Sequence, residues 1–257
     1  MKRIEFTGAA GVGKSTLFSK LLEKRVERSS WYTPKEALIN TVKENFKSKH
    51  PFNRRGLIQY NISPQYHEKW SREILASYKW KIYKSSLPSY NSWINFFIEA
   101  YNENKTHPAS AKMEHFNLFF SQIEELSTLS YFNFKDKIIY EEGLLQHNPG
   151  ITELTSFQQI KYSEENKFQL PVAVVYCKLS VEENYKRRKN RIAQGKGTQN
   201  EREKSDKDLL DLCTRMNDRI SRRVEVLKAI GIPILEVDMS SDLSKNVEKV
   251  NSFINGI

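Results

Sequence analysis

The chain contains the stretch Gly8-Ala9-Ala10-Gly11-Val12-Gly13-Lys14-Ser15-Thr16, directly after a short run, Lys2–Thr7, that predicts a strand. Glycines at positions 8, 11 and 13 allow the backbone to curl so that successive N–H groups point inward, where they can bind phosphate oxygens. The spacing is that of the P-loop pattern, in which a lysine bridges the terminal phosphates and a serine hydroxyl is suited to Mg²⁺. In this chain those two residues are Lys14 and Ser15.

The residues after the loop predict a helix. Apolar side chains recur at helical spacing from Leu17 to Leu22, so the loop opens a helix whose N-terminal dipole also favours anions. Strand, loop and helix therefore follow one another in the order that a phosphate-binding site requires. We expect nucleotide triphosphate binding, with contacts from Gly8, Gly11, Val12, Gly13, Lys14, Ser15 and Thr16.

The composition is that of a folded protein. The chain has 257 residues, of which 12% are aromatic and 28% charged. This excludes global disorder and leaves room for one α/β domain with a large insertion, or for two small domains. No apolar stretch approaches the roughly 20 residues of a membrane span, and the sequence starts on a strand and P-loop instead of a signal peptide, so we expect a cytoplasmic protein. Cys177 and Cys213 lack metal-ligand spacing, and we expect both to be reduced core residues.

The net charge of +10 is unevenly distributed. Residues 35–84 carry eleven Lys or Arg against four Asp or Glu, and residues 178–204 carry nine against four. One explanation is a solvated surface together with phosphate-binding cations. The other is a polyanionic acceptor, DNA or RNA, bound through residues 35–84.

A second candidate motif follows a short apolar strand. The run Lys137–Tyr140 predicts a buried strand, and Glu141-Glu142-Gly143 comes directly after it. In P-loop proteins an apolar strand that ends in an acid carries the second phosphate-site motif, where the carboxylate positions Mg²⁺ or its water. We therefore expect catalytic roles for Glu141 and Glu142, with Ser15 and Glu141 as metal ligands.

A buried strand and a basic helix are expected later in the chain. Residues 171–177 form a continuous apolar run that is typical of a strand between two helix layers. A helix is expected over 181–191, and Arg187 and Arg191 are four residues apart on it, so both guanidinium groups can approach one polyphosphate. Residues 194–204 are polar and contain two glycines, which predicts a mobile flap or, alternatively, an ordinary surface loop.

The middle of the chain is rich in aromatic residues. Apolar and aromatic side chains at helical spacing predict helices over 70–78, 93–101 and 113–129, and stripes of this kind usually form core. The run Tyr78–Lys84 alternates aromatic or apolar residues with lysines, which suits an amphipathic strand or a groove that stacks bases beside phosphate contacts. In a nucleic-acid track, Trp80 or Tyr83 would stack on a base. The residues expected to neutralise phosphates there are Arg54, Arg55, Lys79, Lys81 and Lys84.

The remaining patterns alternate helix and strand. A strand is predicted over 29–33, ended by proline, and a helix over 36–46. Further along, the patterns predict a helix over 208–230, a strand over 232–238 and a terminal helix from Val247 to Ile254.

Together these motifs resemble the thymidylate-kinase-like branch of the P-loop nucleoside and nucleotide kinases. The matching segments are 8–16, 138–143, the basic helix up to Arg191, and 237–241. The resemblance implies a three-layer α/β sandwich with a mainly parallel five-stranded sheet. It also implies ATP and Mg²⁺ as cosubstrates, and lid arginines over the transferred phosphate.

On this basis we expect a single P-loop kinase domain over 1–257, with a helical acceptor-binding insertion at 35–134 and a lid at 187–205. One departure concerns the acceptor. Thymidylate kinases usually carry Asp-Arg after the third strand, where this chain has Glu141-Glu142-Gly143. The acceptor-binding arginine is therefore missing from that position.

We expect an ATP-dependent phosphotransferase that acts on a hydroxyl. The charge distribution favours a nucleic-acid-linked nucleotide, such as a modified base or a strand end. Small nucleosides or nucleotides, and sugars or glycans, stay open as alternatives. An ATPase or nucleotide switch whose insertion binds a partner is the alternative of another class, although the sequence shows neither a guanine-reading motif nor the water-positioning residue expected of a switch.

Overall fold

The computed structural model describes residues 1–25, 31–46, 63–103, 109–147 and 170–257. These residues divide into two compact units. The helical unit comprises the described residues within Met1–Lys2, Ser30–Ile139 and Tyr162–Leu170, and the P-loop unit comprises those within Arg3–Ser29, Tyr140–Lys161 and Pro171–Ile257.

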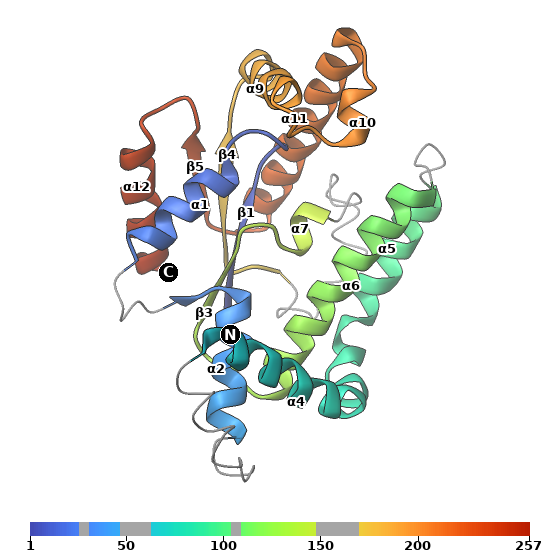
Figure 1. Cartoon of the computed structure of the whole chain (residues 1–257), viewed down its shortest axis with the longest axis vertical. Helices are drawn as coiled ribbons and strands as arrows, with labels where there is room; N and C mark the ends of the chain where they lie inside the picture. The colour runs from blue at the N-terminus through green and yellow to red at the C-terminus, as the bar shows by residue number, and fades with distance from the viewer. Residues whose placement is uncertain (26–30, 47–62, 104–108, 148–169) are drawn as a thin grey trace. The chain divides into compact units, whose positions relative to one another are not determined.

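Five strands form one sheet in the order β2-β3-β1-β4-β5 (Figure 1). The strand pairs β1–β4, β2–β3 and β4–β5 are parallel, with Ile4 opposite Ala173 and Val174 opposite Ile234. The predicted α/β fold with a mainly parallel five-stranded sheet is therefore confirmed. The strands are β1 Lys2–Thr7, β2 Trp31–Tyr32, β3 Lys137–Tyr140, β4 Ala173–Lys178 and β5 Ile234–Asp238.

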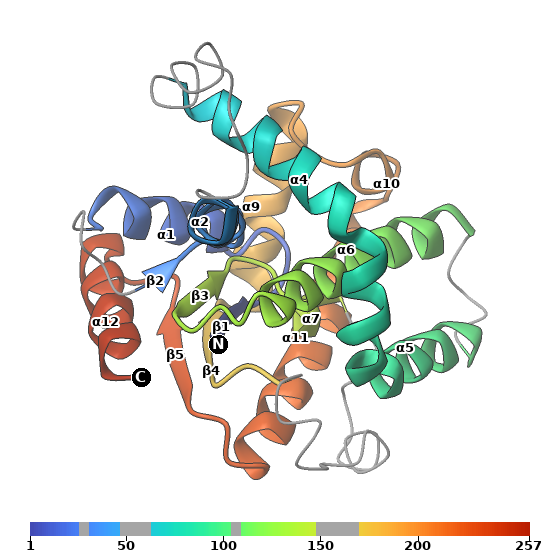
Figure 2. The same cartoon turned by 90° about the horizontal axis from the view of Figure 1, so that it is seen from below.

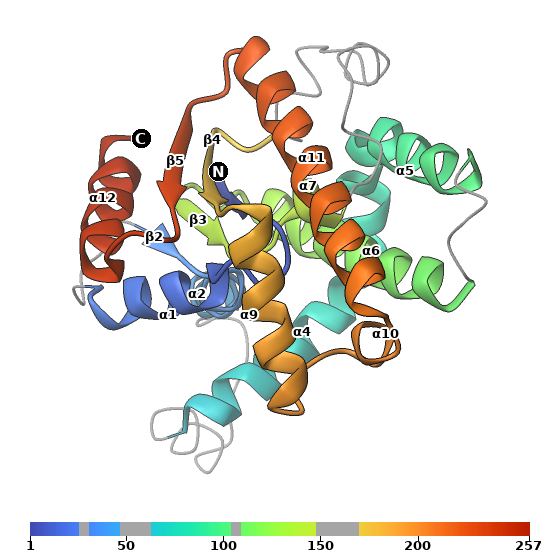
Figure 3. The ribbon, with the colours of Figure 1, turned by 90° about the horizontal axis from the view of Figure 1, so that it is seen from above.

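In the P-loop unit, helices cover both faces of strands β1, β4 and β5 (Figure 3). Helices α1 and α12 lie together on one side, and α11 lies on the other. Strand β4 is consequently buried over Ala173–Cys177, as its continuous apolar sequence predicts. The helices of this unit are α1 Lys14–Glu23, α7 Leu144–His147, α9 Val181–Ala193, α10 Gln199–Arg202, α11 Asp206–Ala229 and α12 Leu243–Gly256.

Side-chain caps fix where three of these helices begin. Ser180 Oγ accepts a hydrogen bond from the Glu183 N–H at 3.2 Å, and Ser205 Oγ accepts one from the Asp208 N–H at 3.2 Å. Asp242 caps α12 in the same way. Each cap satisfies one N–H that the helix itself leaves unpaired. Both cysteines are free and buried, as expected.

Figure 2 shows the helices of the helical unit, and many of the side chains buried among them are aromatic. Helices α2, α4 and α6 contact one another pairwise, and Val42, Trp70 and Ile74 form a buried cluster there. Phe97 and Phe119 stack with ring centroids 3.9 Å apart. The helices are α2 Pro34–Phe46, α4 Pro64–Ser85, the 3₁₀ helix η1 Leu87–Tyr90, α5 Asn91–Glu103 and α6 Ala109–Tyr131.

One local expectation was wrong. The run Tyr78–Lys84 belongs to the 22-residue helix α4, not to a strand, because Trp70, Ile74 and Ile82 fall on one helical face and are buried. The strand predicted before Pro34 is present as β2, and Pro34 is the first residue of α2, where its missing N–H costs nothing.

Some expectations cannot be compared with the structure. Arg54, Arg55 and residues 29 and 30 lie outside the described residues. No helix within the described ranges is both long and apolar enough to cross a membrane.

Candidate active site

The P-loop links β1 to α1 within one unit. Gly11 and Gly13 have φ values of 87° and 107°, in the left-handed region that other residues avoid. The Val12 N–H donates to the Ala9 carbonyl at 3.3 Å, and the Leu17 N–H donates to the Gly13 carbonyl at 3.0 Å. Helix α1 has no side-chain cap, so its first N–H groups are left for a ligand.

Neighbouring groups approach the loop glycines so closely that no side chain would fit. A Cβ built on Gly8 would lie 2.6 Å from the Cys177 carbonyl oxygen. A Cβ built on Gly11 would lie 2.8 Å from Arg188 Cγ. The curl of the loop at Gly8 and Gly11 is therefore fixed from outside by β4 and α9.

Lys14 is buried at 4% exposed, at the start of α1. Its Nζ donates to the Gly8 carbonyl at 2.9 Å and lies 3.3 Å from Glu142 Oε1. An ammonium group has three donors, so the side chain is held over the loop with capacity for a phosphate oxygen. The neighbouring Ser15 and Thr16 are exposed.

The acidic pair follows β3 and lies beside this lysine. Glu142 is 43% exposed and forms the ion pair with Lys14, whereas Glu141 is half-buried. The structure thus brings Lys14 and Glu142 together, as the two motifs predict. The assignment of Glu141 as the metal ligand stays a prediction.

A buried carboxylate in β1 supports the acidic motif, and sequence reasoning missed it. Glu5 is fully buried, and its Oε1 lies 2.7 Å from Arg3 Nε. Its Oε2 accepts a hydrogen bond from the Leu145 N–H at 3.0 Å. A Cβ on Gly143 would overlap the Glu5 carboxyl group, at 2.1 Å from its Cδ. The available signal was the charged pair Arg3 and Glu5 between apolar residues of a strand.

Gln146 of α7 joins the same segment to the loop. Its Nε2 donates to the Gly8 carbonyl at 3.2 Å, the oxygen that also accepts from Lys14. Its Oε1 accepts from the Thr7 hydroxyl at 3.2 Å. These hydrogen bonds of Gln146 therefore connect the segment after the acidic pair to β1 and to Gly8, the first glycine of the loop.

The two arginines proposed for the lid lie in different surroundings. Arg187 donates to the Val12 carbonyl at 2.9 Å and to the Met239 carbonyl at 3.0 Å. Arg191, one turn further along α9, is exposed. Arg187 therefore holds the P-loop backbone, and whether either guanidinium acts on the transferred phosphate stays a prediction.

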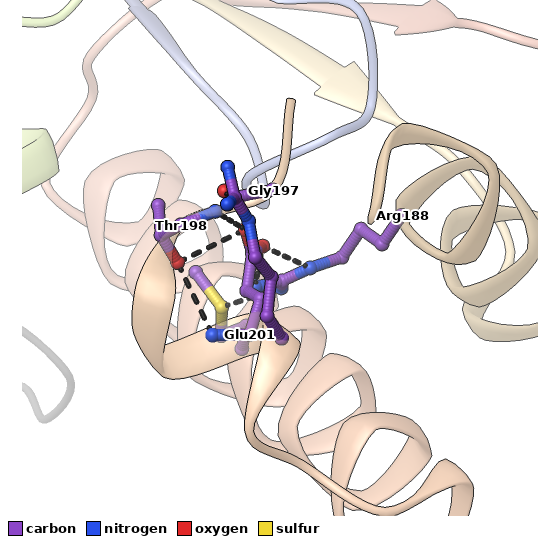
Figure 4. A network of polar contacts seen from close by, with 6 residues as sticks. Arg188, Gly197, Thr198 and Glu201 are labelled. Atoms are coloured by element: carbon purple, nitrogen blue, oxygen red, sulfur yellow. Dashed lines mark hydrogen bonds and ion pairs between the residues drawn. The ribbon is translucent and has the colours of Figure 1, made fainter. Parts of the chain in front are cut away.

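Arg188 was not singled out from the sequence, yet it is the buried arginine of α9 (Figure 4). Its Nε and one terminal nitrogen donate to Glu201 Oε1 at 2.8 and 2.5 Å. The other oxygen of Glu201 accepts from the N–H of Thr198 at 2.7 Å and from its hydroxyl at 3.0 Å.

This network determines the pKa of Glu201. Burial acts to raise the pKa of Glu201, but the Thr198 N–H and the Arg188 charge outweigh it and lower that pKa. The ionised pair links α9 to α10, inside the segment expected to form a lid.

A cavity of about 510 Å³ opens at the carboxyl ends of β4 and β5. Ligands of open α/β sheets bind in such positions. Glu183 lies on its wall and is 3.6 Å from the Arg187 guanidinium. The lining is mainly polar and comprises Lys178, Leu179, Ser180, Glu183, Glu236, Asp238, Ser240 and Lys249.

In the helical unit, two of the lysines expected to contact phosphates, Lys79 and Lys81, interact with neighbouring side chains. Lys79 Nζ lies 3.2 Å from Glu124 Oε1, and the Tyr83 hydroxyl donates to the same carboxylate at 3.2 Å. Lys81 Nζ lies over the Tyr78 ring, 5.2 Å from the ring centroid. Trp80 is 76% exposed.

Comparisons with known proteins give no family assignment. No protein-family model matches the chain, and no curated protein matches it. Matching solved structures include the deoxyadenosine kinase of M. mycoides with the products dCMP and a flexible dCDP bound, at 14% identity and a TM-score of 0.45. The structure of the same enzyme with bound dCTP matches at 13% identity and a TM-score of 0.42, and the structure with bound dATP matches at 14% identity and a TM-score of 0.45.

The three matches cover 99%, 99% and 98% of this chain and 100%, 100% and 99% of those chains. Similarity at these identities and TM-scores does not indicate a function.

Proposed function

We propose that the protein is an ATP-dependent kinase that transfers the γ-phosphoryl group to a hydroxyl of a small molecule. The observation that carries the proposal is the P-loop itself. Gly8 and Gly11 lie against β4 and α9, Gly11 and Gly13 are left-handed, and Lys14 is buried over the loop between the Gly8 carbonyl and Glu142. A lysine is placed in this way where it can neutralise charge on a transferring phosphate.

In the transfer, the acceptor oxygen bonds to the γ-phosphorus, the bond from that phosphorus to the bridging oxygen breaks, and ADP leaves. The loop N–H groups and Lys14 stabilise the charge on the phosphate oxygens. Glu141 or Glu142 accepts the proton that the acceptor hydroxyl loses. Mg²⁺, when bound, neutralises the β- and γ-phosphates, and Ser15 and Glu141 supply the oxygen ligands it prefers.

The cavity at the ends of β4 and β5 is the proposed site of the ATP nucleoside. It lies beside Asp238 and Ser240, which flank the Met239 carbonyl bound by Arg187. Arg187 in turn binds the loop at Val12. A Ser240→Trp substitution fills this cavity, and it is expected to raise the KM for ATP at least tenfold while leaving the turnover of saturated enzyme within a few-fold of wild type.

We propose a small acceptor in place of the nucleic-acid-linked one that the charge distribution favoured. Lys79 is paired with Glu124, and Lys35 and Arg72 are both paired with Glu68. Ion pairs of this kind contribute little to stability, but they reduce the positive field that a polyanion would meet. Nucleosides and nucleotides are the first class to test because the sequence motifs resemble those of their kinases.

A phosphate-transfer screen tests the proposal. Purified protein is incubated with γ-³²P-ATP and Mg²⁺ together with nucleosides, nucleotides, sugars, DNA or RNA, and Lys14→Ala serves as the inactive control. Label recovered on a nucleoside or nucleotide supports the proposal. Label on a polynucleotide restores the nucleic-acid alternative, and ATP loss without any labelled acceptor indicates an ATPase.

A further inference from the structure

Helix α9 forms a wall against the middle of the P-loop. Asn184 and Arg188, one helical turn apart, are buried at 0% and 4% exposed. A Cβ built on Gly11 would lie 3.1 Å from Asn184 Oδ1 and 2.8 Å from Arg188 Cγ. The peptide at Gly11 is therefore in direct reach of the Asn184 carboxamide.

The two wall residues differ in their hydrogen bonds. Arg188 is bonded to Glu201 and to Met216 Sδ. Neither Oδ1 nor Nδ2 of Asn184 has a hydrogen-bond partner among the residues that the structure describes. A buried amide without partners costs stability, and an apolar side chain of similar size would remove that cost. A buried amide of this kind is favourable only in a state of the protein in which it has a hydrogen-bond partner.

We propose that Asn184 is a positioning residue of the P-loop. When the loop holds phosphate, the Asn184 carboxamide hydrogen-bonds the peptide group at Gly11 and fixes the orientation of the loop N–H groups. The inference rests on the proposed function, because it assumes that the loop binds a polyphosphate.

The residue types on both sides suit this role. Gly11, at φ 87°, has no Cβ to hinder rotation of its peptide groups. A carboxamide carries both a donor and an acceptor, so it can bind whichever of C=O or N–H turns toward it. Leucine, which has nearly the same volume, offers neither.

The test compares stability with ligand affinity, using tripolyphosphate as the probe of the loop alone. Asn184→Leu is expected to melt at the wild-type temperature or above it without ligand. Its Kd for tripolyphosphate, from calorimetry, is expected to rise about tenfold, which is the usual contribution of one buried hydrogen bond. A Kd within twofold of wild type overturns the proposal.

Two further variants keep the test decisive if leucine prevents folding. Asn184→Ser retains a hydroxyl that can donate and accept, and Asn184→Ala does not. The proposal expects affinity in the order Asn, Ser, Ala, whatever the melting temperatures. Affinities that are equal, or that simply follow the melting temperatures, assign Asn184 a structural role and overturn it.

A matched control has an amide that is already bonded. Asn217 Nδ2 donates to the Leu179 carbonyl at 3.1 Å, so Asn217→Leu is expected to lower the melting temperature and to leave tripolyphosphate affinity unchanged. Tripolyphosphate binding by the wild-type protein and by Lys14→Ala distinguishes failure of the proposed function from failure of the inference about Asn184. If wild type does not bind tripolyphosphate, the proposed function fails and the inference falls with it. If wild type binds, Lys14→Ala does not, and Asn184→Leu binds like wild type, only the inference fails.

Discussion

The two units of the molecule bury different kinds of side chain. In the helical unit the largest fully buried groups are aromatic, namely Trp31, Tyr90, Trp93, Phe97, Tyr101 and Phe119. Among the described residues, every buried charged side chain lies in the P-loop unit, namely Arg3, Glu5, Lys14, Arg188, Glu201 and Arg223.

This difference indicates in which unit the geometry depends on individual polar atoms. An aromatic core tolerates substitutions that conserve volume, because packing is shared over many contacts. A buried charge instead needs a specific partner at a specific distance, and removal of the partner is costly. In the P-loop unit Lys14 has such partners in the Gly8 carbonyl and Glu142, and Glu5 has one in the Leu145 N–H, so substitutions there are expected to change function more than substitutions in the aromatic core.

The largest expected effect is that of Lys14→Ala. Loss of the ammonium over the loop is expected to reduce turnover at least a thousandfold, while far-ultraviolet circular dichroism keeps the wild-type spectrum. Lys20→Ala is the control, since Lys20 is exposed and pairs with Glu23 on its own helix. Phosphoryl transfer by Lys14→Ala within tenfold of wild type would contradict the P-loop assignment.

The second largest expected effect concerns Glu141 and Glu142, the acidic pair after β3. Glu141→Gln is expected to lower kcat about a hundredfold, as for loss of a general base or a metal ligand. Glu142→Gln removes the partner of Lys14 and is expected to lower kcat less, by about tenfold. Steady-state kinetics at saturating ATP measure both. If neither substitution slows transfer, the pair is structural.

The sequence predicted the loop and its strand and helix because nine contiguous residues determine them locally. It could not predict Asn184, Arg188 or Glu201, since Asn184 and Arg188 act through their contacts with the distant Gly11, and Glu201 acts through its pairing with Arg188 of another helix. The error at Tyr78–Lys84 has another cause. Seven residues are too few to separate a period of two from a helical one when aromatic groups occur on both faces.

The ion pair between Arg188 and Glu201 tests whether buried charge also carries stability. Breaking it on one side, by Glu201→Gln or Arg188→Met, is expected to lower the free energy of unfolding by about 3 kcal/mol. The double replacement Arg188→Met with Glu201→Leu removes both charges and is expected to lose less than either single change. Urea unfolding measures all three. A double variant that loses the sum of the single losses would show that the two side chains act independently.

The ion pair between Arg188 and Glu201 is also expected to make the stability of the protein depend on pH. The folded-state pKa of Glu201 lies below its ordinary value of 4.5, so its contribution to stability is complete above that value. The contribution is lost as pH falls through the folded-state pKa, because the carboxylate must then take up a proton. Wild type is therefore expected to exceed Glu201→Gln in stability at neutral pH, and the gap in melting temperature is expected to narrow below pH 4.5. A gap that stays constant down to pH 3 would contradict the lowered pKa.

The smallest expected effect lies on the surface of the helical unit. Replacing Lys79, Lys81 and Lys84 together by Gln is expected to leave phosphoryl transfer to a small acceptor unchanged. Lys79 already pairs with Glu124, and Lys81 lies over the Tyr78 ring. Each lysine that neutralised a nucleic-acid phosphate would instead add nearly one unit to the slope of log affinity against log salt. Fluorescence anisotropy with labelled single-stranded DNA and RNA at several salt concentrations measures that slope. A steep slope for wild type that falls by about three units in the triple variant would show that these lysines contact phosphates. The acceptor would then be a polynucleotide and not a small molecule.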